Sequence, residues 1–173
     1  MTENMQENVR TNIRTKRMMA PQIMKYIIVA VILAYIAVLM AYASGSSRPF
    51  EEVEAALSSA LDGSGLKKMD SQMLKRNFGL NSADYAGVMY YASESSMSAE
   101  EVLLIRVSGD SQVQEVADAV SERISSRKNA FDGYAPEQVK LLEDAQQSVR
   151  GRYVFFAVSP DAEEYRAVFD GSL

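Results

Sequence analysis

The strongest pattern in the sequence is a run of 18 uncharged and mostly apolar residues at positions 26–43. A helix of this length rises about 27 Å, close to the hydrocarbon thickness of a bilayer. Tyr26 and Tyr42 stand near its two ends, where tyrosine rings favour the membrane interface. The pattern predicts a transmembrane helix at 26–43 that lies in the lipid bilayer as a signal anchor.

The charges on either side of this run predict its direction. Five basic residues precede the run, whereas Arg48 is the only one in the dozen residues after it. Basic flanks stay on the cytoplasmic side. We therefore expect residues 1–25 to form a cytoplasmic tail and the rest of the chain to be extracytoplasmic, with the cell membrane as its location.

A cleavable signal peptide is the alternative interpretation of the same run. Ala41, Tyr42 and Ala43 have the small-x-small form that signal peptidases accept. The apolar run is longer than the ~7–15 residues usual in signal peptides, which favours an uncleaved anchor. Whether the chain is cut after Ala43 stays open at this point.

After a linker at 44–49, apolar residues recur with helical spacing in the segment 50–173. Asp70 is a capping residue and Gly79 a terminating residue for a short helix that ends at Phe78. Helices are also expected from positions 50, 136 and 161. The longest helix follows Ser111, and its apolar face consists of Val113, Val116, Ala117, Val120 and Ile124, with Arg123 among the charged residues outside this face.

Three segments rich in β-branched and aromatic residues, 87–92, 102–108 and 152–159, predict strands. The third is apolar along most of its length, which predicts an interior position in the sheet. The spacing of Ser98 and Glu101 is typical of a capping box and predicts a brief helical turn before the second strand. The predicted fold class is α+β: one N-terminal transmembrane helix followed by a small antiparallel-rich three-stranded sheet with helices packed on one face.

Composition and charge exclude several functions. The chain has no cysteine and no histidine, so disulfides, thiolate nucleophiles, Cys/His zinc sites and Ser-His-Asp triads are ruled out. Residues 44–173 carry 13 basic and 21 acidic residues, a balance that predicts no nucleic-acid partner.

Three pairs of adjacent carboxylates invite an acid-base or metal interpretation. The pairs are Glu51/Glu52, Glu100/Glu101 and Glu163/Glu164. Each pair falls in the first turn of a predicted helix, where the helix dipole stabilises negative charge. We therefore expect no catalytic residue, no metal, no cofactor and no enzymatic activity.

Several stretches together resemble one protein family. They are the apolar segment near the N-terminus, the strand at 101–106, the sequence FDGYAPEQ at 131–138 and the sequence GRYV at 151–154. This combination is similar to the DUF4358-type domains of unknown function, which occur in clostridial exported, membrane-anchored proteins, over about residues 48–170. The resemblance implies a Gram-positive cell envelope and brings no activity with it.

The segment 131–138 is also the candidate interaction site. Its chemistry-bearing side chains are Asp132, Tyr134, Glu137 and Gln138. A structural explanation stands beside the functional one, because Asp132 precedes a glycine as in turns and Pro136 is typical of a helix start.

The sequence predicts a single-pass, membrane-anchored extracytoplasmic domain that serves as a protein-interaction or structural module, with an unknown envelope protein as partner. The alternatives are a domain that binds a small ligand or a cell-wall fragment, and a histidine-free hydrolase. A pocket with convergent polar groups would favour ligand binding, whereas a flat apolar patch would favour the interaction module.

Overall fold

The computed structural model describes residues 24–36 and 48–173, and the chain divides into two units between Ser44 and Gly45. The second unit contains the helices α2 (Phe50–Ala60), α3 (Ser71–Phe78), α4 (Gln112–Phe131), α5 (Pro136–Glu143) and α6 (Ala162–Gly171), together with a 3-10 helix, η1 (Ser82–Asp84). Its strands are β1 (Lys67–Lys68), β2 (Gly87–Ala92), β3 (Glu101–Arg106), β4 (Gln146–Arg150) and β5 (Tyr153–Val158).

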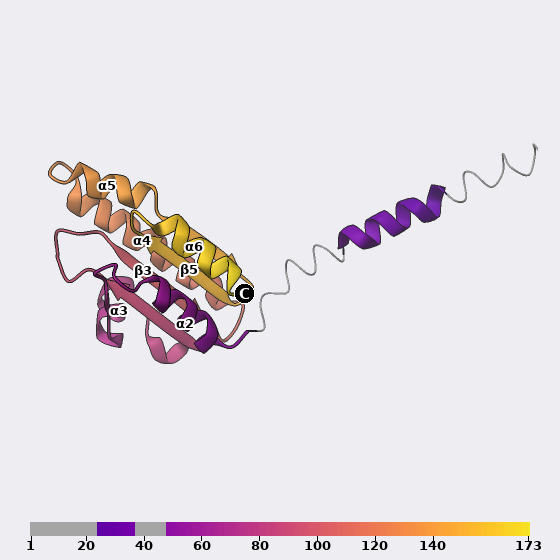
Figure 1. Cartoon of the computed structure of the whole chain (residues 1–173), viewed down its shortest axis with the longest axis horizontal. Coiled ribbons are helices and arrows are strands. Elements are labelled where there is room, and N and C mark those ends of the chain that lie inside the picture. The colour runs from indigo at the N-terminus through magenta and orange to yellow at the C-terminus, as the bar shows by residue number, and fades with distance from the viewer. Residues whose placement is uncertain (1–23, 37–47) are drawn as a thin grey trace, which may run out of the picture. The chain divides into compact units, whose positions relative to one another are not determined.

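The strands form one sheet in the order β1-β2-β3-β5-β4, and every neighbouring pair is antiparallel (Figure 1). Leu103 of β3 lies opposite Tyr90 of β2 and opposite Phe156 of β5. Both β3 and β5 are therefore interior strands, as the apolar sequence of the third predicted strand indicated.

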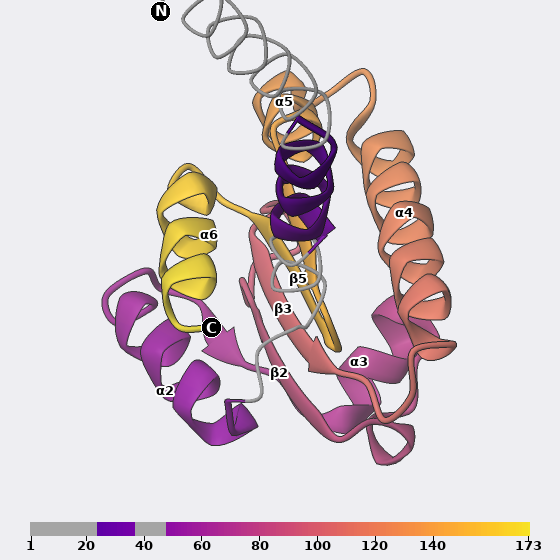
Figure 2. The same ribbon diagram turned by 90° about the vertical axis from the view of Figure 1, so that its right-hand side faces the viewer.

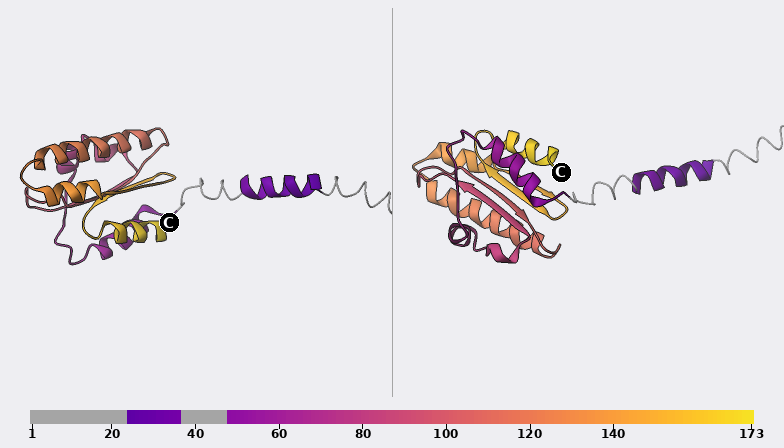
Figure 3. Two further views of the ribbon diagram at one scale, coloured as in Figure 1. Left: turned by 90° about the horizontal axis from the view of Figure 1, so that it is seen from above. Right: turned by 60° about the horizontal axis from the view of Figure 1, so that its bottom comes forward.

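Helices cover both faces of this sheet. Figure 2 shows α2 and α6 on one side and α3 and α4 on the other, and the view from above in Figure 3 places α5 on the side of α4. Two separate clusters of buried side chains fill the two interfaces. Phe156 belongs to the cluster under α3, α4 and α5, and its neighbour Phe155 belongs to the cluster under α2 and α6.

The predicted helices on one face are therefore wrong. All six residues of β5 are buried, and the first five of β3 are buried as well. Successive side chains of a strand point to opposite faces, so a continuous buried run requires cover on both. The apolar runs in the sequence are therefore sufficient to predict helices on both faces of the sheet.

The predicted number of strands is also wrong, because the sheet has five strands and not three. The two strands that the pattern missed are the edge strands, β1 and β4. Lys67 and Lys68 are exposed, and Ser148 is the only buried residue of β4. Polar and charged edges discourage pairing with other chains, and for the same reason they lack the apolar alternation that identifies a strand.

Most helix predictions are confirmed. The Asp70 side chain accepts a hydrogen bond from the Met73 backbone N–H at 2.9 Å, and Gly79 closes α3 with φ 72°. The expected helical turn at Ser98 to Glu101 is wrong: Glu101 begins β3, and the chain before it makes a turn at Ser96 and Met97.

The N-terminal unit contains a helix at residues 24–36. Across residues 24–36 and 48–173, no helix combines the length and the hydropathy that a membrane crossing requires. This finding corrects the transmembrane helix of the predicted fold class. Residues 37–43 of the predicted span, most of the predicted linker and residues 1–23 lie outside the described part of the chain.

A substitution at Gly87 tests how α2 packs on the sheet. A Cβ at Gly87 would meet the ring of Phe50 at 2.4 Å, and Phe50 is buried. Gly87→Ala should therefore destabilise the domain by about 1–3 kcal/mol through overpacking. Thermal unfolding followed by circular dichroism checks this, with Gly109→Ala as the control, because the nearest atom to a Cβ there is 3.9 Å away. Equal melting temperatures of the two variants would contradict the packing described.

Candidate functional site

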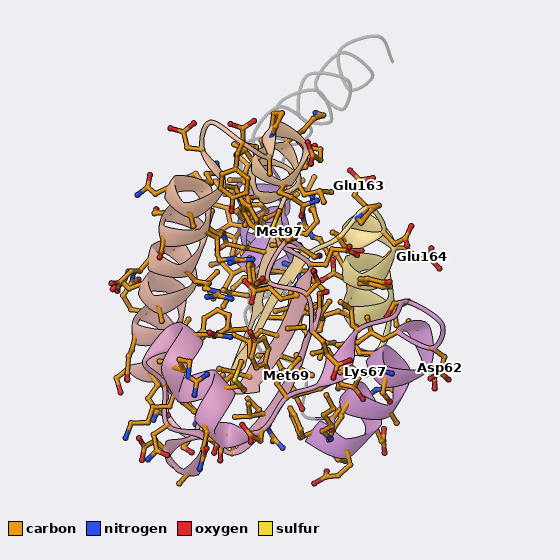
Figure 4. All side chains as sticks on the ribbon, turned by 90° about the vertical axis from the view of Figure 1, so that its left-hand side faces the viewer. Asp62, Lys67, Met69, Met97, Glu163 and Glu164 are labelled. Carbon is orange, nitrogen blue, oxygen red and sulfur yellow. The ribbon has the colours of Figure 1, made fainter. Side chains whose placement is uncertain are left out.

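A pocket of about 300 Å³ opens at one end of the sheet. Its walls come from α3, the end of β2, the loop between β2 and β3, the start of β3 and one side of α4. Figure 4 views the domain from this end, with Met97 in the loop and Met69 just before α3. Elements far apart in the sequence therefore meet around one cavity.

Glu101 lies at the inner wall of this pocket and is 1% exposed. Arg123 of α4 binds it in a two-pronged ion pair: its Nε donates to Oε1 at 3.0 Å, and its Nη2 donates to Oε2 at 3.0 Å. Burial lowers the pKa of the Arg123 guanidinium. The hydrogen bonds to Glu101 and its negative charge have the larger combined effect, so the pKa is raised. A buried carboxylate needs such a partner because isolated charge in the interior is costly.

Tyr90 of β2 supplies a further hydrogen bond to the same carboxylate. Its hydroxyl donates to Glu101 Oε2 at 2.9 Å and accepts from Asn77 Nδ2 at 2.7 Å. Burial, followed by the charge of Glu101, raises the pKa of Tyr90 far above its usual range. The hydroxyl therefore stays protonated and keeps its role as a donor, and the network ties α3 to β2, β3 and α4.

Arg127 lies one turn beyond Arg123 on α4 and also lines the pocket. Its Nη2 donates to the Ser98 carbonyl at 2.7 Å, and its guanidinium lies 4.4 Å from the centre of the Phe131 ring. Its Nε is buried and has no hydrogen-bond partner among the described residues. Burial, followed by the charge of Arg123, lowers the pKa of Arg127.

The loop between β2 and β3 is held from two sides. Gln138 of α5 accepts a hydrogen bond from the Ala99 backbone N–H at 2.7 Å, and Arg127 holds the Ser98 carbonyl. Within the loop, the Ser93 N–H donates to the Glu100 carbonyl at 3.0 Å. The loop is thus a fixed wall of the pocket, braced by the helix that follows α4.

The structure separates the four residues of the predicted interaction site. Gln138 reaches the loop beside the pocket, as described above. Asp132 follows the end of α4 and Glu137 lies in the first turn of α5, both exposed. Tyr134 is 56% exposed and lies 5.9 Å, centre to centre, from the buried Phe131 ring. Gln138 alone among the four has a defined contact with a pocket wall, and a role of the group in binding stays a prediction.

The two residues at the centre of the network were misjudged from the sequence. The sequence predicts Glu101 in the first turn of a helix and Arg123 outside the apolar face of the longest helix, yet the side chain of Arg123 is only 17% exposed. The sequence does contain a pattern that places the two arginines on the buried face of α4. Positions 116, 120, 123, 127 and 131 follow the spacing of a single helix face. Val116, Val120 and Phe131 on that face are buried, and the two arginines lie between them.

The other two pairs of adjacent carboxylates lie in the first turn of a helix, as the sequence predicted. Glu51 and Glu52 lie in the first turn of α2, and Glu163 and Glu164 in that of α6. Within residues 24–36 and 48–173, no group of three or more acidic residues is placed to hold a metal ion.

A sequence model of the family described as "Domain of unknown function (DUF4358)" matches residues 59–159. The match covers more than half of the chain and confirms the resemblance over the strand at 101–106, the FDGYAPEQ sequence and the GRYV sequence, whereas the apolar segment near the N-terminus lies outside it. It runs from the end of α2 to just beyond β5, so it contains every wall of the pocket. No curated protein and no solved structure matches the chain.

The ion pair of Glu101 and Arg123 predicts a strong coupling between the two positions. Arg123→Met should destabilise the domain by about 3 kcal/mol, because it leaves a carboxylate buried without its cation. The double variant Glu101→Leu with Arg123→Met should lose less than the sum of the single variants, since no charge then stays unpaired. Urea unfolding of the full chain gives the free energy of unfolding of the two single variants and of the double variant.

Arg152→Met is the matched control, because Arg152 pairs with Asp110 on the surface at 57% and 85% exposure. Exposed pairs contribute about 0–1 kcal/mol. Strictly additive losses at positions 101 and 123, or a loss at Arg123 no larger than at Arg152, would contradict the buried pair.

Proposed function

The chain belongs to the DUF4358 family, and on that premise we propose that its folded domain binds a small molecule in the pocket between α3, α4 and the β2–β3 loop. The observation that carries the proposal is the convergence of a buried, hydrogen-bonded polar network on a cavity of about 300 Å³. Binding sites for small molecules are concave and combine apolar walls with a few fixed polar groups.

The walls offer both kinds of contact. Met69 and Met73 present flexible thioether chains, which adapt to apolar groups of different shape. Arg127 and the serines of the β2–β3 loop present donors and acceptors. Because Gln138 and Arg127 brace the loop, these groups are positioned before a ligand arrives, which reduces the entropy lost on binding.

The buried network ties up its own carboxylate. Hydrogen bonds from Arg123 and Tyr90 hold the Glu101 carboxylate in the wall of the cavity, so it is not a free base. General acid-base work requires a group within reach of the substrate proton. Binding without chemistry is the function we propose, and the absence of enzymatic activity stays a prediction.

The interaction-module hypothesis has weaker support. Three large apolar side chains are exposed within residues 48–173: Met97, Tyr134 and Val149. They belong to three different segments of the chain, and protein interfaces usually bring together a denser group of aromatic and apolar anchors. An envelope protein as partner, contact with the bilayer, an extracytoplasmic location and the lack of a nucleic-acid partner stay predictions from the sequence.

Filling the pocket tests the proposal. Met73 lines the cavity, so Met73→Trp should occupy part of its volume, whereas Met73→Leu keeps the volume nearly unchanged. The full chain and both variants are incubated with a low-molecular-mass cell extract and recovered, and the bound compounds are identified by mass spectrometry. We expect at least one compound to be enriched by the wild type and Met73→Leu, and at least ten-fold less by Met73→Trp.

Equal enrichment by all three proteins, or none by any, would overturn the proposal. A circular dichroism spectrum of Met73→Trp that matches the wild type establishes that a loss of binding comes from the filled cavity and not from unfolding.

A further inference from the structure

The fixed charges at the inner wall of the pocket do not balance. Arg123 and Arg127 are both positive, and Glu101 is the only carboxylate that forms an ion pair with either of them among the described residues. Arg123 uses that carboxylate in both prongs. One positive charge, on Arg127, is therefore left without a counter-charge at hydrogen-bond distance.

The guanidinium of Arg127 has unused donors. Of its five N–H groups, the structure engages one from Nη2, on the Ser98 carbonyl. The Nε–H has no acceptor among the described residues but is shielded from solvent, whereas Nη1, from which no described side chain accepts, is not shielded and can meet a ligand. The stacking on Phe131 and the bond to Ser98 hold the plane of the guanidinium in place. A fixed, planar guanidinium with unused donors matches the oxygens of a carboxylate or a phosphate in a two-pronged pair.

The charge around the site favours a single negative charge on the ligand. Glu101 lies at the inner wall, and the exposed Glu94 and Arg76, together with Glu100, line the outer part of the pocket. The outer charges of Arg76 and the two glutamates leave no net positive charge there, so at the inner wall one carboxylate is enough to neutralise Arg127. A dianion such as a phosphate monoester would carry a second charge into the neighbourhood of these three acidic side chains, where like charges repel.

The opposite wall combines two methionines with the polar side chains of Arg76 and Asn77. Met69 and Met73 line the pocket from α3 and the chain before it, and both pack against the buried cluster under α3 and α4. A volume of about 300 Å³ lies at the lower end of the range for small-molecule sites, so the apolar part of the ligand is short.

From these observations we infer that the pocket binds a small monocarboxylate, with its carboxylate on Arg127 and its apolar chain against Met69 and Met73. This inference rests on the proposed function, because it names the class of ligand that the same pocket takes. Arg127 acts as the anion-binding group. Arg123 is the positioning group, because it holds Glu101 and so keeps that carboxylate from pairing with Arg127 in place of the ligand.

Pentanoate, pentanamide and inorganic phosphate are suitable probes. The full chain, labelled with ¹³C at its methionine methyl groups and kept soluble with a non-ionic detergent, is titrated with each probe and followed by NMR. Met69 and Met73 report on the pocket, whereas Met89 lies buried under the opposite helices and is an internal control. We expect pentanoate to shift the Met69 and Met73 signals saturably and to bind at least ten-fold more tightly than pentanamide or phosphate.

Arg127→Met should weaken the binding of pentanoate at least ten-fold while the Met89 signal stays in place, which shows that the variant is folded. Arg152→Met removes a surface arginine and should change nothing.

The outcomes separate this inference from the proposed function. If pentanamide shifts Met69 and Met73 as strongly as pentanoate does, the pocket binds small molecules but the carboxylate assignment is overturned. Tighter binding of phosphate, or an unchanged affinity for pentanoate in Arg127→Met, would overturn it as well. If no probe shifts either signal, the monocarboxylate assignment fails, and the experiment with the cell extract decides separately whether the pocket binds anything.

Discussion

The burial of one carboxylate, that of Glu101, is the constraint on which the rest of the domain depends. A charge in the interior is tolerated only with a well-placed counter-charge and hydrogen bonds. Glu101 obtains these from Arg123 on α4 and from Tyr90 on β2, and Tyr90 is held in turn by Asn77 on α3. The network therefore fixes how two helices lie on the sheet at the end where the pocket opens.

The same constraint gives the pocket its character. Because Arg123 is committed to Glu101, Arg127 one turn later is left as a cation with unused donors, fixed by Phe131 and Ser98. The interaction that stabilises the fold thus also leaves one arginine at the inner wall of the cavity without a counter-charge. Stability and binding are linked through adjacent turns of a single helix.

The sequence predicted those elements whose signal is local. The apolar runs of β3 and β5 and the ends of α3, marked by Asp70 and Gly79, follow from propensity and capping alone. The edge strands β1 and β4 were missed because their polar residues serve to protect an edge. The site was missed because a buried ion pair joins residues 22 positions apart, and single-residue patterns assign charged side chains to the surface.

The most direct test of this account is an NMR measurement of the arginine side chains in the full chain. The two-pronged ion pair predicts that the Nε–H of Arg123 exchanges slowly with solvent and that rotation about its Nε–Cζ bond is slow enough to give separate Nη signals. The exposed Arg152 serves as the reference for fast exchange. An Arg123 Nε–H that exchanges as rapidly as that of Arg152 would contradict the account, because Glu101 would then lack the partner that its burial requires.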